Sequence, residues 1–266
     1  MTPFLAVEVT YGGEFEGALD NINALFDMPT LVELGPLSIN RTILIAFLMT
    51  GIAAFLFFRA FKSPTVVPGK LQSACEMVID FVRGIAVDII GPVKGPKFVP
   101  LLTTFFVFIL FMNLAKLTPF LMLPPTSRIA FPLVLAVTAW VIYVSVGIRE
   151  QGFGGYFKEL AFPPGVPKAL YLILTPIELI SNLLLRPFTL MVRLFANMVA
   201  GHILVVITLV TIHVFLYPRP GLPVGILALL ASPVVFIFEL FIIALQAYIF
   251  TMLTAVYISS SVEPAH

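Results

Sequence analysis

One uninterrupted apolar run, residues 169–216, places the strongest limit on how this chain can fold. It spans 48 residues and is apolar apart from Glu178, the stretch 186–202 and scattered single polar residues. A straight helix of that length would extend about 72 Å, more than twice the ~30 Å hydrocarbon thickness of a bilayer. Either Pro187 divides the run into two crossings, or the run is one long, steeply inclined helix.

Four further runs are long and apolar enough to cross a membrane, because about 20 helical residues span the hydrocarbon core. They are residues 42–61, 98–123, 129–148 and 222–258. Of the whole chain, 60% is hydrophobic and only 11% is charged, whereas soluble domains are about 25% charged. The sequence therefore predicts an all-α integral membrane protein with about five membrane-embedded helices.

The remaining segments differ in composition from these runs. Residues 1–40 contain six acidic residues and no Lys or Arg, which predicts an extramembrane segment with room for one short interfacial helix. Residues 41–266 are expected to form the membrane domain. Within it, residues 71–91 carry their charges roughly along one side, which predicts an amphipathic helix on the membrane surface. Residues 149–168 are expected to be a loop.

The distribution of basic residues predicts the orientation. With five crossings and the N-terminus outside, nine basic residues flank the inner ends of the spans and four flank the outer ends, in keeping with the positive-inside tendency. The inner residues are Arg59, Lys62, Lys70, Arg83, Lys94, Lys97, Arg149, Lys158 and Lys168; the outer ones are Arg41, Lys116, Arg128 and Arg219. Dividing the long run into two crossings would change this count by only one, so the count does not decide that question.

Composition also excludes several functions. A net charge of +1 provides no basic patch for a nucleic acid. The single cysteine, Cys75, has no second thiol for a disulfide or a metal site, and we expect neither a metal nor a cofactor. The first residues lack the basic start of a secretory signal.

The polar residues of the last two apolar runs predict an antiparallel hairpin. If the chain turns back at YPRPG, facing residues have sequence numbers with a constant sum. Arg193 with Gln246 gives 439 and His202 with Glu239 gives 441, and both sums centre the turn within that motif. We therefore expect these pairs to lie at matching depths.

Helical phase, at 100° per residue, predicts separate polar faces. His202 points away from the face of Arg193, and His213 returns to the side of His202. A kink at Pro187 would blur the phases before it but not those after it. The arginine face comprises Asn182, Arg186, Arg193, Asn197 and Ala200; a stripe on the last helix comprises Ser232, Glu239, Gln246 and Tyr257.

Arg193 needs a partner, because an isolated arginine facing lipid is costly. Glu178, the acidic residue of the same run, lies fifteen residues or about 22 Å away along the helix. We therefore expect the counter-charge on another subunit.

The motif RPFTLMVRLFANMVAGH (186–202), together with LQAYIFTMLTAVYI (245–258), resembles the subunit a family of F-type ATP synthases. PIELISNLL and NLAKLTPF also resemble family segments, and the likeness covers most of the chain from about residue 40. It implies a stator subunit, not itself an enzyme, that couples proton flow to rotor rotation and ATP synthesis. It also implies that the last two helices are very long, steeply tilted and antiparallel, so that 169–216 is one inclined helix.

The resemblance implies a role for each polar residue. Arg193 would face the carboxylate of the c-subunit ring and block a direct leak between two offset aqueous half-channels, with Asn197 and Gln246 in support. His202 and Glu239 would form the inlet pair. Glu178, with Ser181 and Asn182 nearby, would line the outlet. Where some relatives have an acidic residue in the second span this chain has Lys116, and from the sequence we assign it no proton-relay role.

Structural alternatives stay open for several of these residues. Arg193 could pair with a lipid phosphate, and His202 could be a hydrogen-bonded core histidine. Glu178 could extend to the inner membrane surface. Supporting roles are less specific for the remaining polar residues, where interfacial placement or helix–helix contact is an alternative. These are Arg186, Asn113, His213, Ser232 and Tyr257.

Two other classes of protein were weighed against this hypothesis. A stand-alone transporter would be expected to have repeated halves, and an intramembrane hydrolase would need a nucleophilic or metal-binding motif; the spans provide neither. The expected partners are the c-ring, b-type peripheral-stalk subunits, the rest of the synthase and membrane lipid, but no nucleic acid. The expected location is a bacterial plasma membrane with the C-terminus in the cytoplasm, or alternatively an energy-transducing organelle membrane.

Overall fold

The computed structural model describes residues 30–34, 37–118, 125–162, 171–216 and 221–262. Five helical segments in this part are long and apolar enough to cross a membrane, and they coincide with the five predicted runs. They are Thr42–Phe61, Gly95–Leu117, Ala130–Gln151, Tyr171–Leu216 and Leu222–Val262. The prediction of an all-α, multi-pass membrane protein is confirmed.

A small hairpin precedes the first of these helices and was not predicted. Strands β1 (Thr30–Leu34) and β2 (Leu37–Asn40) pair antiparallel, with Leu34 opposite Leu37. Both strands are rich in Leu, Val, Ile and Thr and flank a Gly-Pro dipeptide, which is a hairpin signal that the acidic composition of residues 1–40 obscured. The expected interfacial helix would fall largely in residues 1–29, outside the described residues.

Helices α2 (Arg41–Phe61), α3 (Lys70–Ile90) and α4 (Gly95–Leu114) follow. α3 buries Val82, Ala86 and Ile90, while its Asp80–Arg83 pair is exposed. α3 and α4 meet closely because Gly95 has no side chain: a Cβ there would lie 2.5 Å from the Ala86 carbonyl oxygen. α3 occupies the segment expected to be a surface helix, and its location relative to a bilayer remains a prediction.

The expected loop at 149–168 contains a helix, which corrects that prediction. α5 (Ala130–Gln151) ends at Gly152, whose φ of 75° only glycine adopts readily, and α6 (Phe153–Ala161) begins directly after it. α6 folds back because Gly147 leaves room for the ring of Tyr156. Burial there raises the pKa of the Tyr156 hydroxyl. The remaining residues of the loop, 163–170, lie outside the described residues.

The long apolar run forms one continuous helical segment instead of two crossings. α7 (Tyr171–Ile180) passes through a π-helical turn, η4 (Ser181–Leu185), into α8 (Arg186–Leu216). The wider turn, in which the Arg186 amide donates to the Ser181 carbonyl, lies just before Pro187 and accommodates it without breaking the helix. At 46 residues, or about 69 Å, this segment must incline steeply to remain within a bilayer.

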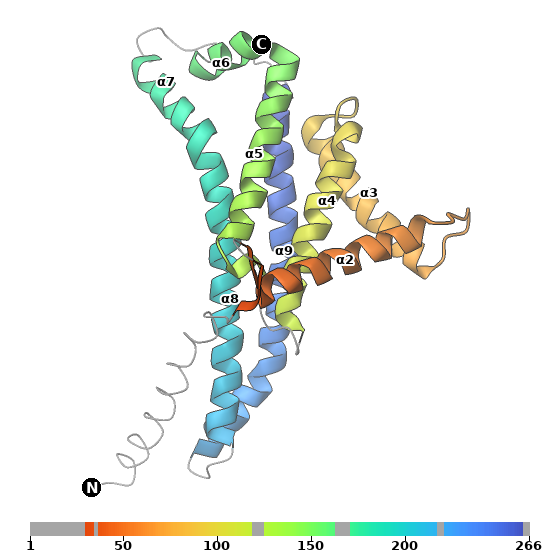
Figure 1. Cartoon of the computed structure of the whole chain (residues 1–266), viewed down its shortest axis with the longest axis vertical. Helices are drawn as coiled ribbons and strands as arrows, with labels where there is room; N and C mark the ends of the chain where they lie inside the picture. The colour runs from red at the N-terminus through yellow and green to blue at the C-terminus, as the bar shows by residue number, and fades with distance from the viewer. Residues whose placement is uncertain (1–29, 35–36, 119–124, 163–170, 217–220, 263–266) are drawn as a thin grey trace.

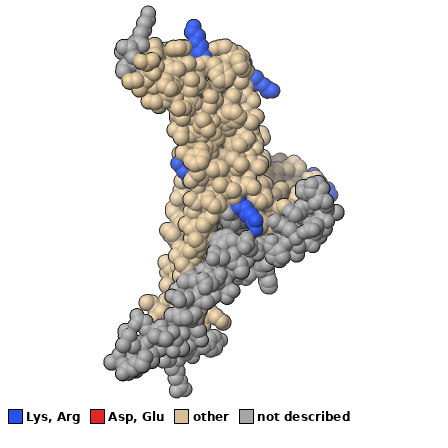
Figure 2. All heavy atoms as spheres, turned by 60° about the vertical axis from the view of Figure 1, so that its left-hand side comes forward, with Lys and Arg blue, Asp and Glu red and all other residues tan. Residues whose placement is uncertain are grey.

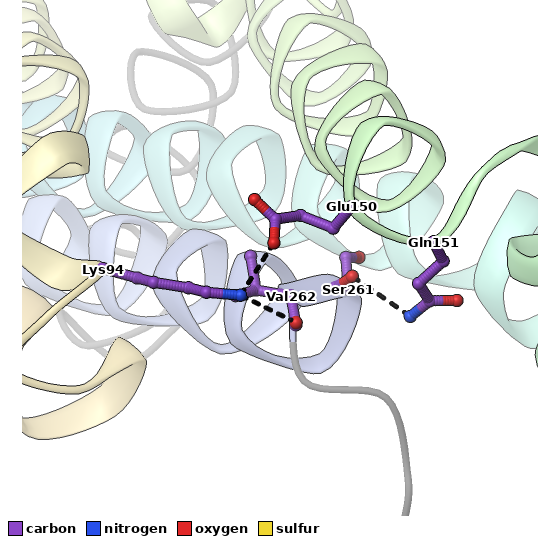
Figure 3. Close-up of polar contacts among 5 residues, drawn as sticks. All are labelled: Lys94, Glu150, Gln151, Ser261 and Val262. Atoms are coloured by element: carbon purple, nitrogen blue, oxygen red, sulfur yellow. Dashed lines mark hydrogen bonds and ion pairs between the residues drawn. The ribbon is translucent and has the colours of Figure 1, made fainter.

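α9 (Leu222–Val262) runs back beside α8 along the length of the molecule, while α4 and α5 flank its C-terminal half (Figure 1). Phe250, Ile258 and neighbouring apolar residues of α9 form the core with α3, α4 and α5. Polar contacts close this end (Figure 3): Lys94 Nζ donates to Glu150 Oε2 at 2.8 Å and to the Val262 carbonyl at 3.3 Å, and Gln151 donates to the Ser261 carbonyl at 3.3 Å.

Candidate functional site

The register between α8 and α9 agrees with the one predicted from sequence numbers. A Cβ on Gly201 would lie 2.6 Å from a Glu239 carboxylate oxygen, and these two numbers add to 440. Nearer the turn, a Cβ on Gly225 would lie 2.6 Å from the Leu216 amide nitrogen, which gives 441. The hairpin therefore brings the residue after Gly201, His202, to the depth of Glu239.

The partner of Glu239, however, is Lys116. Its ammonium forms an ion pair with Glu239 Oε2, and neither side chain is exposed at all. Lys116 belongs to η1 (Ala115–Leu117), the short 3₁₀ turn that ends the second span. Lys116 thus lies at the end of the span, as expected, but its side chain points inward between α8 and α9; which end of the span is the outer one remains a prediction.

Gly201 is the residue on α8 that leaves space for this pair. A Cβ at that position would collide with Lys116 Nζ and lie 2.6 and 2.7 Å from the two Glu239 oxygens. Glu239 Oε1 has no hydrogen-bond partner among the described residues. The result is a buried charge pair with one carboxylate oxygen still able to accept a proton.

A cavity of about 240 Å³ lies beside this ion pair, with Lys116 in its wall. Lys116 and His202 line it together with Leu117, Val205, Val206, Leu209 and Phe236. His202 is itself buried, at 4% exposure. The cavity thus places an imidazole and an ammonium, both able to carry a proton, on the walls of one internal space.

Arg193 has the opposite environment. Its side chain is exposed, whereas the preceding and following turns of α8 bury Leu190 and Leu194 against the rest of the molecule. It has no hydrogen bond or ion pair with any of the residues described here. Asn197, one turn further, is half-buried.

The side of the molecule that carries α7 and α8 is almost without charge. In Figure 2 most of the described surface belongs to residues other than Lys, Arg, Asp and Glu; a few separate basic side chains are visible on it, and no acidic atom of the described residues is. An exposed, permanently charged guanidinium on an apolar helix pair therefore has no counter-charge supplied by the described part of this chain.

Asn182 does not share the environment of Arg193, although their helical phases had suggested it. Asn182 is buried, its amide donates to Glu178 Oε2 at 3.0 Å, and its carbonyl accepts from the Tyr143 hydroxyl of α5 at 2.8 Å. The π-helical turn that contains Asn182 changes the phase of the helix before Arg193. Ser181, in the same turn, is half-buried.

Arg186 is held by its own chain. Its guanidinium lies 5.1 Å from the centre of the Tyr257 ring and donates to Ser260 Oγ at 3.2 Å. The Tyr257 ring in turn packs on Tyr143, 5.5 Å between centres. These contacts join α8 to the C-terminal end of α9.

The other sequence candidates are more dispersed. Asn113 is fully buried and accepts a 2.7 Å hydrogen bond from Thr126. Gln246 is buried on α9, and its Nε2 has no hydrogen-bond partner among the described residues. His213 is exposed, and Ser232 donates only to the Leu229 carbonyl of its own helix.

Comparison with known proteins decides the family. The family model described as ATP synthase A chain matches residues 42–259. The chain belongs to this family. Members named ATP synthase subunit a include that of Rhodococcus erythropolis, 42% identical over 96% of this chain and 93% of the relative. Those of Frankia alni and Streptomyces lividans are 41% and 40% identical, over 93% and 85% of this chain and 86% and 81% of theirs.

In this member of the family, the geometry adds two residues that sequence reasoning left aside. Lys116 carried a usable signal, since a lysine at the end of an apolar span can enter the membrane domain as well as leave it. Gly201, just before His202, carried no such signal, because a glycine within a helix does not by itself indicate which side chains pack against it. Among the described residues, no group of side chains is suited to hold a metal ion.

Proposed function

We propose that this ATP synthase subunit supplies two offset aqueous half-channels and presents Arg193 to a carboxylate on a neighbouring ring of c subunits. Proton flow through the half-channels would turn that ring and drive ATP synthesis in the catalytic head, while this subunit itself is not catalytic. The observation that carries the proposal is the exposed side chain of Arg193 on an otherwise apolar stretch of α8, without an acidic partner among the described residues.

A fixed cation on such a face does two things. It attracts the ionised ring carboxylate as each c subunit passes, and it repels a proton that would otherwise cross directly between the half-channels. Arginine suits this position because its guanidinium does not lose its proton in proteins. The half-buried Asn197 and the buried Gln246 would support the path beside it.

The inlet would be the cavity lined by His202, with Glu239 beside it at the same depth. Histidine changes charge near neutral pH and so can pass protons there. The outlet would begin at Glu178, where the hydrogen bond from Asn182 holds the carboxylate at 3.0 Å. Glu178 and His202 are 24 residues apart on the long α7–α8 segment, or about 36 Å along a helix, as offset channels require.

Membrane potential would contribute through these channels. Moving one elementary charge across 100 mV releases about 2.3 kcal/mol, so a rotor that takes one proton per step can accumulate energy over several steps.

We further propose that residues 41–266 form the membrane domain and residues 1–40 lie outside it. The bacterial relatives favour a bacterial plasma membrane, and the distribution of basic residues favours an N-terminus outside it. A b-type stalk would hold the subunit still.

Replacing Arg193 by Ala tests the proposal. In the purified complex, Arg193→Ala is expected to abolish ATP-driven proton pumping while the complex still assembles with its ring and head. The matched control is Arg186→Ala, which removes another arginine of the same helix that Tyr257 and Ser260 hold, and which is expected to retain pumping. Coupled pumping in an assembled Arg193→Ala complex would refute the proposal.

A further inference from the structure

The cavity beside His202 does not reach Glu239 directly. The described residues that line it include Lys116 and His202 but not Glu239, whose side chain is fully buried. Lys116 lines the cavity, and its ammonium forms the ion pair with Glu239 Oε2. It is therefore the group through which the internal space meets the carboxylate.

We propose that Lys116 carries protons from this cavity to Glu239. The inference rests on the proposed function and adds to it a residue of the inlet, contributed by the second span and placed before Glu239 in the path. Lysine can perform this step because its ammonium, unlike a guanidinium, can release a proton in a protein interior.

The transfer balances in two steps. The Nζ–H bond of Lys116 breaks and an O–H bond forms on Glu239 Oε2, so that the charged pair becomes a neutral amine and a neutral carboxylic acid. The amine then takes a proton from the cavity, from water or from the His202 imidazolium, and the acid releases its own proton toward the rotor. The net result is one proton taken from the cavity and one delivered, with the original pair restored.

A purely structural role accounts poorly for this arrangement. A buried ion pair gains little over apolar side chains of similar volume, because removing two charges from water offsets their attraction. The helix pair could close more simply if α8 carried a small apolar side chain at Gly201 and no charges faced it. Instead, Gly201 leaves the space that both charged groups occupy, and Glu239 Oε1 stays without a hydrogen-bond partner among the described residues.

The test compares three substitutions of Lys116 in the whole complex reconstituted in liposomes, with ATP synthesis driven by an imposed proton gradient. Lys116→Arg keeps the positive charge but holds its proton, and Lys116→Met removes the charge. Both are expected to slow synthesis about 100-fold, the range that positioned proton transfer contributes. Lys116→His restores a group able to release a proton, and it is expected to recover part of the rate with an altered pH profile. His202 of α8 and Glu239 of α9 face this position, so their titration is shared by all three variants.

The outcomes separate the alternatives. A wild-type rate in Lys116→Arg would show that Lys116 is only a counter-charge, and a wild-type rate in Lys116→Met would show that it is dispensable; either result overturns the inference.

If the Arg variant fails to assemble, the double variant Lys116→Met, Glu239→Gln removes both charges at similar volume. It is expected to assemble without proton-driven synthesis, and normal synthesis would again overturn the inference. Failure of the proposed function is distinct, since it would appear as normal coupling in Arg193→Ala.

Discussion

Gly201 of α8 faces Glu239 of α9 so closely that no methyl group fits between them. A Cβ atom on Gly201 would lie 2.6 Å from one carboxylate oxygen and 2.7 Å from the other. This approach fixes the register of the last two helices and defines the space in which the Lys116–Glu239 ion pair lies.

We predict that Gly201→Ala assembles but conducts protons about 5- to 150-fold more slowly. The added methyl group must displace the charged pair, and overpacking of this kind costs about 1–3 kcal/mol, where each 1.4 kcal/mol corresponds to about tenfold. The measurement is proton-driven ATP synthesis by the reconstituted complex. Gly51→Ala is the control, because Gly51 lies in α2 with no atom near its would-be Cβ. Normal synthesis in the assembled Gly201 variant would show that the pair is not confined as described.

Disulfide formation is expected across the hairpin at matching depths. Cysteines at positions 202 and 239 should crosslink readily in the assembled complex. A second pair, at Val205 and Phe236, tests the same register without disturbing a charged residue, since both line the cavity. The control pairs position 205 with position 241, where Phe241 is exposed on another side of α9.

The native cysteine contributes little background to that experiment. Cys75 is buried on α3, and burial raises the pKa of its thiol. Because the thiolate is the reactive form, a raised pKa leaves less of it at any given pH below that value.

For the engineered pairs, crosslinks at equal yield in the matched and the control pair would argue against the antiparallel register.

Glu239→Gln is expected to slow proton uptake and to change its pH dependence. The amide keeps the size of the side chain but cannot bind and release a proton, and it leaves the Lys116 charge buried without a counter-charge, which is strongly destabilising locally. Proton uptake by the reconstituted complex, measured over a range of pH, gives the comparison. An unchanged pH profile would remove Glu239 from the path.

Local patterns in the chain predicted the membrane helices and the facing residues of α8 and α9. Hydropathy and run length indicate a spanning helix without reference to any other segment, and the described part of the chain contains five such helices. The constant sum of facing positions needs only a helical rise and one turn. It therefore anticipated that Glu239 would lie level with Gly201 and His202.

Local patterns misplaced the residues whose environment depends on other segments. Asn182 matched Arg193 in phase, but the π-helical turn that contains Asn182 changed the phase of the helix before Arg193, and Asn182 contacts Tyr143 of α5. The loop after α5 became a helix because Gly147 accommodates Tyr156.

By itself, the sequence determined that this chain is a bundle of membrane helices whose last two run antiparallel, since length, apolarity and helical rise are properties of each segment. Only the tertiary structure decided that Lys116 would meet Glu239, 123 residues further along the chain. A lysine near the end of a span can point to water or to the protein interior, and its own neighbours in the sequence favour neither. The direction of the lysine side chain depends on whether packing brings a carboxylate and enough space close to it. In this protein α9 supplies the carboxylate, and Gly201 of α8 leaves the space.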